Sequence, residues 1–294
     1  MRIAFIGCVE FSHAALEHLL SIPKAEIVAV VTRESSDFNA DFRSLRPLAE
    51  ANRIPYFLSA GDDDASMLEW LSGFKLDVGY CFGWSKLLSS AVLALPRHGI
   101  VGFHPTELPM NRGRHPLIWA LALGLRETAS TFFFMADAPD SGPILSQVKL
   151  PIHDDDDARS LYSRVTDTAL KQLTELTRGL GDGTLVAVPQ DQMRASYWRR
   201  RTAVDGRIDW RMSGRSIRNL VRALASPYPG ATFLHCGADV IVRKVALAGG
   251  AAENLEPGKV LSVEGNTFTV RVGDGAIRIL DHDLADLPAV GSYL

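Results

Sequence analysis

Short apolar runs alternate with segments of helical hydrophobic spacing along the first half of the chain. Apolar runs bounded by polar residues predict buried strands, which lie over 2–7, 26–32, 54–58, 76–83 and 99–104. Apolar residues at helical spacing predict intervening helices, which lie over 12–22, 41–53 and 66–74. Continuous apolar strands separated by helices are typical of a parallel sheet covered on both faces. We therefore expect a Rossmann-like α/β domain with an open, mostly parallel sheet and a ligand crevice at the carboxyl ends of its strands.

The pattern changes after a long helix predicted over 157–180. Residues 181–210 show little periodicity, which indicates a connecting segment, and 213–225 then has helical spacing with a Ser213 cap. Short strands with Gly-containing turns follow over 230–237, 239–248, 258–265, 266–275 and 276–284. Such regularly spaced strands predict a smaller C-terminal β-barrel of OB-like type. We expect a first domain over 1–185, a linker over 186–205 and a second domain over 206–294.

The composition is that of an ordinary globular protein and narrows the choice of partners. A chain of 294 residues is long enough for two domains, and 47% hydrophobic with 22% charged residues is typical of soluble proteins. The formal net charge of −3 provides no general attraction to nucleic acid or to an anionic membrane. Cys8, Cys81 and Cys236 lie far apart without metal-ligand spacing, so we expect no metal and no disulfide framework.

The apolar segments are too short for export or membrane insertion. The N-terminal apolar run breaks at Gly7, whereas the apolar region of a signal peptide spans about 7–15 residues. No stretch approaches the roughly 20 apolar residues that cross a bilayer. We therefore expect a cytoplasmic protein without a membrane partner.

A histidine and an aspartate mark the ends of predicted strands. His104 ends the strand 99–104, and Asp140 lies in a turn within 130–152. If both turns open at the same sheet edge, the carboxylate would orient the imidazole and stabilise its cationic form. Such a pair suits a reaction in which an amine loses a proton while negative charge grows on a carbonyl oxygen. Asp137 competes with Asp140 by spacing, and a merely hydrogen-bonded strand-end histidine is the alternative.

Three stretches of the chain read "GFHPTELP", "NRGRHPLIWAL" and "DSGPILSQ". They resemble the Asn-x-His, Arg-Gly-x-x-Pro and Asp-x-Gly motifs of the folate-dependent formyltransferases, which formylate amines with 10-formyltetrahydrofolate. The likeness extends to "MRIAFIGCVEFS" at the start and to "GRIDW", "VRALASPYPGA" and "PGKV" in the last third. It implies a formyltransferase over essentially the whole chain, with 10-formyltetrahydrofolate as cosubstrate.

The resemblance also implies roles for particular residues. The acceptor amine would attack the formyl carbon, His104 would donate a hydrogen bond to the resulting oxyanion, and Asp140 would support His104. The resemblance places the folate pocket along the loop 81–89. The residues expected to contact folate are Cys81, Phe82, Gly83, Trp84, Leu87, Arg112 and Asp137. Arg112 belongs to the Arg-Gly turn and has a structural role as its alternative.

The chain departs from the family at one catalytic position, because the family's asparagine falls on Gly102. Losing one oxyanion donor costs about 10²–10³ in rate. Three explanations stay open: a replacement donor such as Thr106, a backbone N–H or a water; a divergent branch with a rearranged site; or a domain that binds ligands without efficient catalysis.

The identity of the acceptor rests on charge. Methionyl-tRNA formyltransferases typically carry a basic, Gly-rich insertion after the second strand, but residues 31–50 hold three arginines against four acidic residues, which argues against nucleic acid. The segment "SYWRRRTAVDGRIDW" instead offers arginines for a diphosphate and an aromatic ring for stacking, with a solvent-facing linker as the alternative. The residues expected to contact the acceptor are Cys8, Glu10, Phe11, Tyr197, Arg199, Arg201 and Tyr228.

These observations favour an N-formyltransferase acting on a nucleotide-linked amino sugar. The alternatives are a methionyl-tRNA formyltransferase, an enzyme that formylates an amino-acid-derived or siderophore-type amine, and a non-catalytic folate- or nucleotide-binding module. An apolar surface on the small β domain would suit a homodimer.

Overall fold

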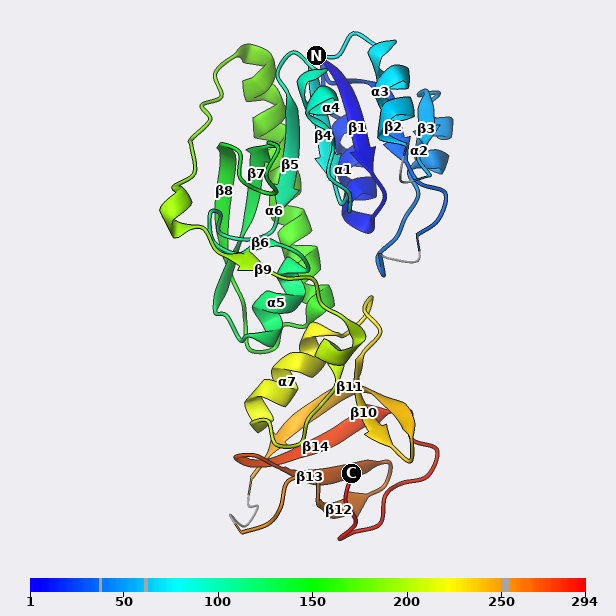
Figure 1. Cartoon of the computed structure of the whole chain (residues 1–294), viewed down its shortest axis with the longest axis vertical. Helices are drawn as coiled ribbons and strands as arrows, with labels where there is room; N and C mark the ends of the chain where they lie inside the picture. The colour runs from blue at the N-terminus through cyan, green and yellow to red at the C-terminus, as the bar shows by residue number, and fades with distance from the viewer. Residues whose placement is uncertain (37–38, 61–62, 250–253) are drawn as a thin grey trace. The chain divides into compact units, whose positions relative to one another are not determined.

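The computed structural model describes residues 1–36, 39–60, 63–249 and 254–294. Figure 1 shows the elements along the chain. The helices are α1 (Glu10–Leu20), α2 (Arg46–Ala51), α3 (Asp64–Ser72), α4 (Ser90–Ala94), α5 (Pro116–Ala122), α6 (Ala158–Asp182), η1 (Gln192–Arg194), η2 (Ala203–Gly206) and α7 (Gly214–Ala223). The strands are β1 (Arg2–Gly7), β2 (Glu26–Thr32), β3 (Tyr56–Leu58), β4 (Val78–Phe82), β5 (Ile100–His104), β6 (Arg112–Gly113), β7 (Glu127–Phe134), β8 (Ile144–Pro151), β9 (Tyr197–Trp198), β10 (Ala231–His235), β11 (Ala238–Ala248), β12 (Val260–Glu264), β13 (Thr267–Val272) and β14 (Gly275–His282).

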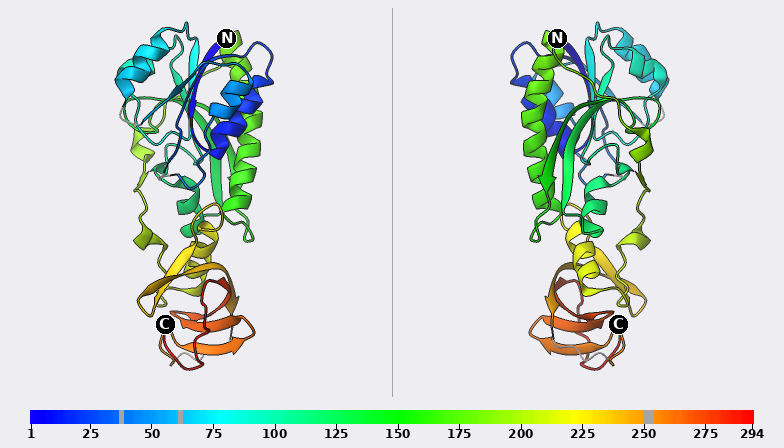
Figure 2. Two further views of the ribbon diagram at one scale, coloured as in Figure 1. Left: turned by 90° about the vertical axis from the view of Figure 1, so that its right-hand side faces the viewer. Right: turned by 90° about the vertical axis from the view of Figure 1, so that its left-hand side faces the viewer.

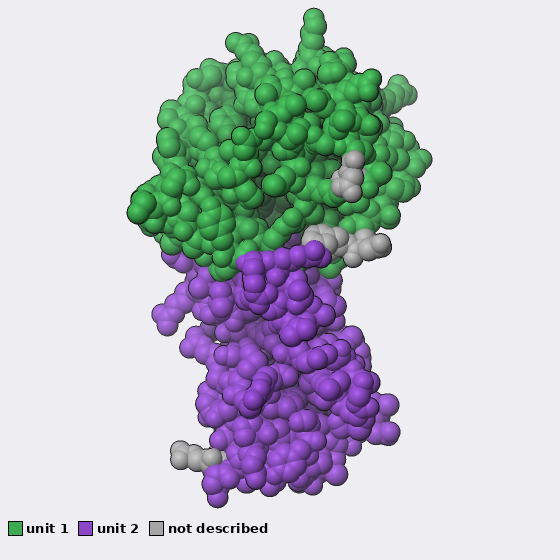
Figure 3. All heavy atoms as spheres, in the orientation of Figure 1, with its two compact units in different colours: residues 1–116, 128–150, 163–198 green, residues 117–127, 151–162, 199–294 purple. Residues whose placement is uncertain are grey.

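The chain divides into two compact units, coloured separately in Figure 3. Unit 1 contains residues 1–116, 128–150 and 163–198, and unit 2 contains residues 117–127, 151–162 and 199–294. Each unit is described by itself below.

Unit 1 is built around a seven-stranded sheet with the order β3-β2-β1-β4-β5-β7-β8. The first five strands in this order are parallel, as their buried apolar runs predict, whereas β7 pairs antiparallel with β5. The predicted mostly parallel sheet is therefore mixed at one side. Between β5 and β7 the chain forms only the short β6 and α5, which do not carry it back to the amino end of β5, so β7 runs antiparallel to β5. This arrangement is a Rossmann-like α/β architecture with an antiparallel extension.

Helices cover both faces of this sheet. Figure 2 shows α1 and α6 on one face and α3 on the other. A hydrogen bond between His18 Nε2 and Thr174 Oγ1 (2.7 Å) joins α1 to α6, and one between Tyr80 and Thr177 (2.9 Å) joins β4 to α6. Loops follow the carboxyl ends of the parallel strands β1, β4 and β5, which is where an open α/β sheet binds its ligands.

The helix predicted over 41–53 is shorter in the structure. It begins only at Arg46, because Pro47 lies in its first turn and proline is tolerated there but not in a helix interior. Upstream, the N–H of Leu45 donates to Thr32 Oγ1 (3.0 Å) and that of Arg43 donates to the carbonyl of Cys8 (3.0 Å). These bonds hold the preceding segment against the ends of β1 and β2 instead of extending the helix.

Unit 2 contains α7 and a five-stranded antiparallel sheet of order β10-β11-β14-β13-β12. The predicted cap is present, since Ser213 Oγ accepts the N–H of Ser216 (3.0 Å). Arg222 of α7 donates to the carbonyls of His153 (3.0 Å) and Asp156 (3.1 Å), which ties the segment 151–162 to this unit. Within the described residues, no helix combines the length and the apolar character needed to cross a membrane.

Candidate active site

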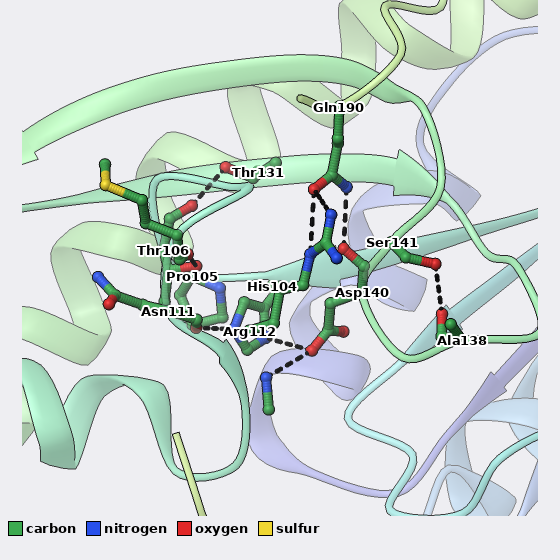
Figure 4. Close-up of polar contacts among 12 residues, drawn as sticks. His104, Pro105, Thr106, Asn111, Arg112, Thr131, Ala138, Asp140, Ser141 and Gln190 are labelled. Atoms are coloured by element: carbon green, nitrogen blue, oxygen red, sulfur yellow. Dashed lines mark hydrogen bonds and ion pairs between the residues drawn. The ribbon is translucent and has the colours of Figure 1, made fainter. Parts of the chain in front are cut away.

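His104 occupies the last position of β5 and is almost fully buried, with 5% of its surface exposed. Its Nε2 lies 2.8 Å from the carbonyl oxygen of Asn111 (Figure 4). Because a carbonyl only accepts hydrogen bonds, Nε2 carries a proton and donates it to this bond. The tautomer is therefore set by the backbone, and Nδ1 is the ring nitrogen that remains for chemistry.

Asp140 supplies the charge beside that nitrogen. Its Oδ2 lies 3.7 Å from His104 Nδ1 and accepts the N–H of Gly113 at 2.8 Å. Asp137, the competing aspartate, instead accepts the hydroxyl of Ser90 at the start of α4 (2.7 Å). The structure thus brings Asp140, rather than Asp137, beside His104 at the carboxyl end of β5.

The turn after β5 is fastened by a buried arginine. Arg112, only 1% exposed, donates from Nε (3.2 Å) and Nη2 (2.6 Å) to Gln190 Oε1. Its Nη1 donates to Gln192 Oε1 (3.0 Å) and to the Tyr197 hydroxyl (2.8 Å). Arg112 was expected at the folate pocket, and its guanidinium here lies among neutral side chains of unit 1, where it builds the turn that presents the Asn111 carbonyl.

Gln190 and Asn111 are site residues that sequence reasoning missed. Gln190 is 8% exposed, and its Nε2 donates to the carbonyls of Asp140 (2.8 Å) and Gly142 (2.6 Å). Asn111 acts through its backbone carbonyl and has a positive φ of 62°. A polar residue in an aperiodic segment carries no sequence signal for such a contact, although Asn directly before an Arg-Gly turn is typical of a left-handed position.

Gly102 lies opposite Phe133 in the antiparallel pairing of β5 and β7. A Cβ atom built on Gly102 would lie 2.9 Å from Phe133 Cζ and 3.0 Å from Met135 Cγ. Real Cβ atoms essentially never come closer than 3.0 Å to such neighbours, so a side chain at position 102 would have to displace the Phe133 ring or the Met135 side chain. Residue 102 thus faces an apolar wall formed by Phe133 and Met135.

Thr106, expected as a replacement donor, is buried in the turn after β5. Its hydroxyl donates to the carbonyl of Met110 (3.2 Å), and its own carbonyl accepts the hydroxyl of Thr131 (2.6 Å). The side chain therefore spans the turn that carries Asn111.

The loop expected to line a folate pocket begins inside the sheet. Cys81 and Phe82 belong to β4 and are buried, and burial raises the pKa of the Cys81 thiol. Gly83 has a φ of +63°, and a Cβ there would lie 2.1 Å from Val9 Cγ2, so this position requires glycine. Trp84 is half-buried against the core, whereas Leu87 is exposed. Cys81 and Phe82 are therefore too deeply buried to contact a ligand, whereas the loop that begins at Gly83 has an exposed side chain, Leu87, that could do so.

The acceptor residues expected near β1 lie at its carboxyl end. Cys8 is buried, and burial raises the pKa of its thiol from 9.0 to about 11, opposed by the positive charge of Arg33. Phe11 packs on Phe103 with ring centroids 4.3 Å apart, while Glu10 is exposed. Glu10 is therefore the accessible member of this set.

The remaining acceptor candidates are divided between the two units. Tyr197 belongs to unit 1 and is 61% exposed, with its hydroxyl accepting from Arg112. Arg199 and Arg201 belong to unit 2, where both guanidinium groups lie over the Trp119 ring, at 5.3 and 4.5 Å. Arg199 also pairs with Asp205, whose pKa this contact lowers, and Arg201 is buried. Tyr228 follows α7 in unit 2, in a turn where its N–H donates to the carbonyl of Ala225 (3.1 Å).

The charge of the loop after β2 was used to argue against tRNA. Its residues 37–38 lie outside the described residues, and among the described ones Arg46 pairs with both Glu50 (2.9 Å) and Glu34 (3.4 Å). Among His, Cys, Asp and Glu side chains of the described residues, there is no cluster of three that would hold a metal ion.

Family models match both parts of the chain. Residues 1–177 match the model described as "Formyl transferase", and residues 201–290 match "Formyl transferase, C-terminal domain". The chain belongs to the formyl transferase family.

Solved structures with the same fold include members of different branches. The N-formyltransferase from Helicobacter canadensis, in complex with folinic acid and dTDP-3-aminofucose, has a TM-score of 0.72 and 16% identity over 96% of this chain and 99% of that one. HypX from Aquifex aeolicus, in complex with tetrahydrofolic acid, has a TM-score of 0.67 and 18% identity. It is matched over 96% of this chain but only 44% of its own, so this formyl transferase spans less than half the length of HypX. Methionyl-tRNA formyltransferase from Clostridium thermocellum has a TM-score of 0.59 and 15% identity over 84% and 94% of the two chains.

Proposed function

We propose that this formyl transferase moves the formyl group of 10-formyltetrahydrofolate to the amine of a nucleotide-linked amino sugar. The observation that carries the proposal is the His104–Asp140 pair at the carboxyl end of β5, with Nε2 bound to the Asn111 carbonyl. This bond leaves Nδ1, beside the Asp140 carboxylate, as the group that acts on a substrate. A protonated Nδ1 donates a hydrogen bond to an oxygen on which negative charge develops.

The reaction balances with these two side chains. The acceptor nitrogen forms a bond to the formyl carbon, and the bond from that carbon to N10 of the folate breaks. The proton lost by the amine passes through Asp140 and His104 to the departing N10. Because Phe133 and Met135 lie beside Gly102, the negative charge that develops on the formyl oxygen is stabilised by the N–H of His104 Nδ1.

The comparisons support both substrates. The H. canadensis N-formyltransferase holds folinic acid and dTDP-3-aminofucose, and it matches this chain over almost all of both lengths. WlaRD, a sugar 3N-formyl transferase studied with dTDP and 5-N-formyl-THF, has a TM-score of 0.71 and 17% identity over 98% of this chain. Both have higher TM-scores than the methionyl-tRNA formyltransferase, which favours the sugar acceptor.

The test is release of tetrahydrofolate from 10-formyltetrahydrofolate, with nucleotide-linked amino sugars and methionyl-tRNA offered separately. We expect turnover with a sugar nucleotide and its loss in His104→Ala. His98→Ala is the matched control, because His98 is exposed and lies two residues before the start of β5, at the end opposite to His104. Equal rates for His104→Ala and the wild type would overturn the proposal.

Methionyl-tRNA is the second candidate acceptor, favoured by the likeness to the C. thermocellum enzyme. The salt dependence of acceptor binding separates the two candidates. Binding of a tRNA depends on contacts with several phosphates, so it weakens more steeply with salt concentration than binding of a sugar nucleotide. Binding of folate without turnover on any acceptor would instead favour the non-catalytic module suggested by Gly102.

We also propose that the sheet of unit 2 closes into an OB-like barrel. The long strand β11 pairs with β10 and then with β14, and its register shifts around Lys244. Such irregularities bend a strand and increase its twist, which supports closure of a small barrel.

A further inference from the structure

Gln190 lies between the two loops that carry the candidate catalytic pair. Its carbonyl oxygen Oε1 accepts from Nε and Nη2 of Arg112, and its amide nitrogen donates to the carbonyls of Asp140 and Gly142. Figure 4 shows the Gln190 side chain between Arg112 and Asp140. One buried amide thus uses its acceptor on one loop and its donors on the other.

The segment that carries Gln190 is itself anchored at both ends. We call residues 188–198 the strap. At its start, Val188 and Ile144 exchange two backbone hydrogen bonds of 2.8 Å. Near its end, the carbonyl of Ser196 accepts the N–H of Arg112 (2.9 Å), and Tyr197 pairs with Arg112 in the short β6–β9 ladder. Gln190 is therefore held on a backbone that is fixed on either side of it.

The side-chain hydrogen bonds of Gln190 connect it to both members of the candidate catalytic pair. Asp140 has a left-handed φ of +53°, a conformation that persists in a non-glycine residue when its surroundings hold it. The side-chain amide of Gln190 stabilises this conformation by donating a hydrogen bond to the backbone carbonyl of Asp140. On the other loop, Gln190 fixes Arg112, and the neighbouring Asn111 carbonyl binds His104 Nε2.

We infer that Gln190 is a positioning residue for formyl transfer, which sets the distance between His104 Nδ1 and the Asp140 carboxylate. This inference rests on the proposed function. A misplacement of about 1 Å in a catalytic group costs up to about 10²-fold in rate, so the effect of losing Gln190 is measurable.

Gln190→Glu separates positioning from simple pairing with Arg112. The glutamate still accepts from Arg112, but it loses both N–H donors and directs an oxygen at the carbonyls of Asp140 and Gly142. We expect kcat to fall about 10- to 100-fold, with the KM for both substrates changed less than about threefold.

Gln192→Leu is the matched control. Gln192 also accepts from Arg112 (3.0 Å), yet no hydrogen bond joins its side chain to Asp140 or Gly142 among the described contacts. We expect its kcat and both KM values to stay within about threefold of the wild type. Equal losses in the two variants would overturn the inference, since they would assign the effect to Arg112 alone.

His104→Ala, measured in the same assay, distinguishes failure of the positioning role from failure of the proposed function. An inactive His104→Ala together with a fully active Gln190→Glu overturns the positioning role and leaves the proposed function intact. A fully active His104→Ala overturns the proposed function. If Gln190→Glu does not fold, Gln190→Met is measured instead, and unfolding of both would overturn the inference by showing a role in folding.

Discussion

Phe133 of β7 occupies the space into which a side chain on Gly102 of β5 would project. A Cβ on Gly102 would lie 2.9 Å from Phe133 Cζ, and the two residues are direct cross-strand partners. A side chain at position 102 would therefore have to displace the Phe133 ring, so substitutions at the two positions are expected to be coupled.

Gly102→Asn should lower stability without raising activity. Overpacking a core position of this kind costs about 1–3 kcal/mol of unfolding free energy. Combining it with Phe133→Leu should recover part of that loss, with a coupling of about 0.5–3 kcal/mol in a double-mutant cycle measured by denaturant unfolding. A single Gly102→Asn variant that is both as stable as the wild type and faster would contradict this account of the apolar wall.

Asp140→Asn should reduce kcat by about 10²–10⁴-fold while leaving the fold intact. The amide keeps the shape and its oxygen still accepts the N–H of Gly113, but the charge beside His104 Nδ1 is gone. Single-turnover kinetics with a saturating acceptor measure the change. Asp182→Asn, at the exposed end of α6, is the control for loss of a carboxylate, and an equal effect in both would rule out a specific role.

Tyr197→Phe distinguishes acceptor binding from support of Arg112. The variant keeps the ring 5.6 Å from the guanidinium and removes only the hydroxyl that accepts from Arg112 Nη1. A supporting role predicts a loss of about 0.5–1.5 kcal/mol in unfolding free energy with an unchanged KM for the acceptor. A raised acceptor KM at unchanged stability would show instead that the hydroxyl contacts the acceptor.

Alkaline pH should destabilise the protein through Cys8. Its thiol has a pKa of about 11 in the fold against 9.0 without the protein environment. The stabilising contribution is therefore complete below pH 9 and is lost as pH rises from 9 to 11, because the unfolded thiol ionises there while the folded one stays protonated. Cys8→Ala should reduce the drop in unfolding free energy between pH 8 and 10.5, whereas replacing the exposed Cys236 should not. An identical drop in the wild type and Cys8→Ala would contradict the assigned cause.

Local patterns along the chain predicted most of the elements. The apolar runs predicted as strands over 2–7, 76–83 and 99–104 contain β1, β4 and β5, and Ser213 caps the helix that follows it. These elements follow from period and capping, which depend on residues a few positions apart. The predicted start of the helix over 41–53 was wrong: the helix begins at Arg46, with Pro47 in its first turn, because the preceding residues contact the ends of β1 and β2.

The sequence by itself determined the strands, the Ser213 cap and the candidates His104, Asp140 and Asp137, of which a shared sheet edge would bring the histidine and one aspartate together. Only the tertiary structure decided that Asp140 rather than Asp137 lies beside His104, that Phe133 fills the place next to Gly102, and that Gln190 joins the two loops. Each of these depends on strand pairing and on side chains far apart in the chain. The periodicity of apolar residues indicates which face of a helix or strand is buried. It does not indicate which groups form a buried hydrogen bond, because the two partners are brought together only by the folded chain.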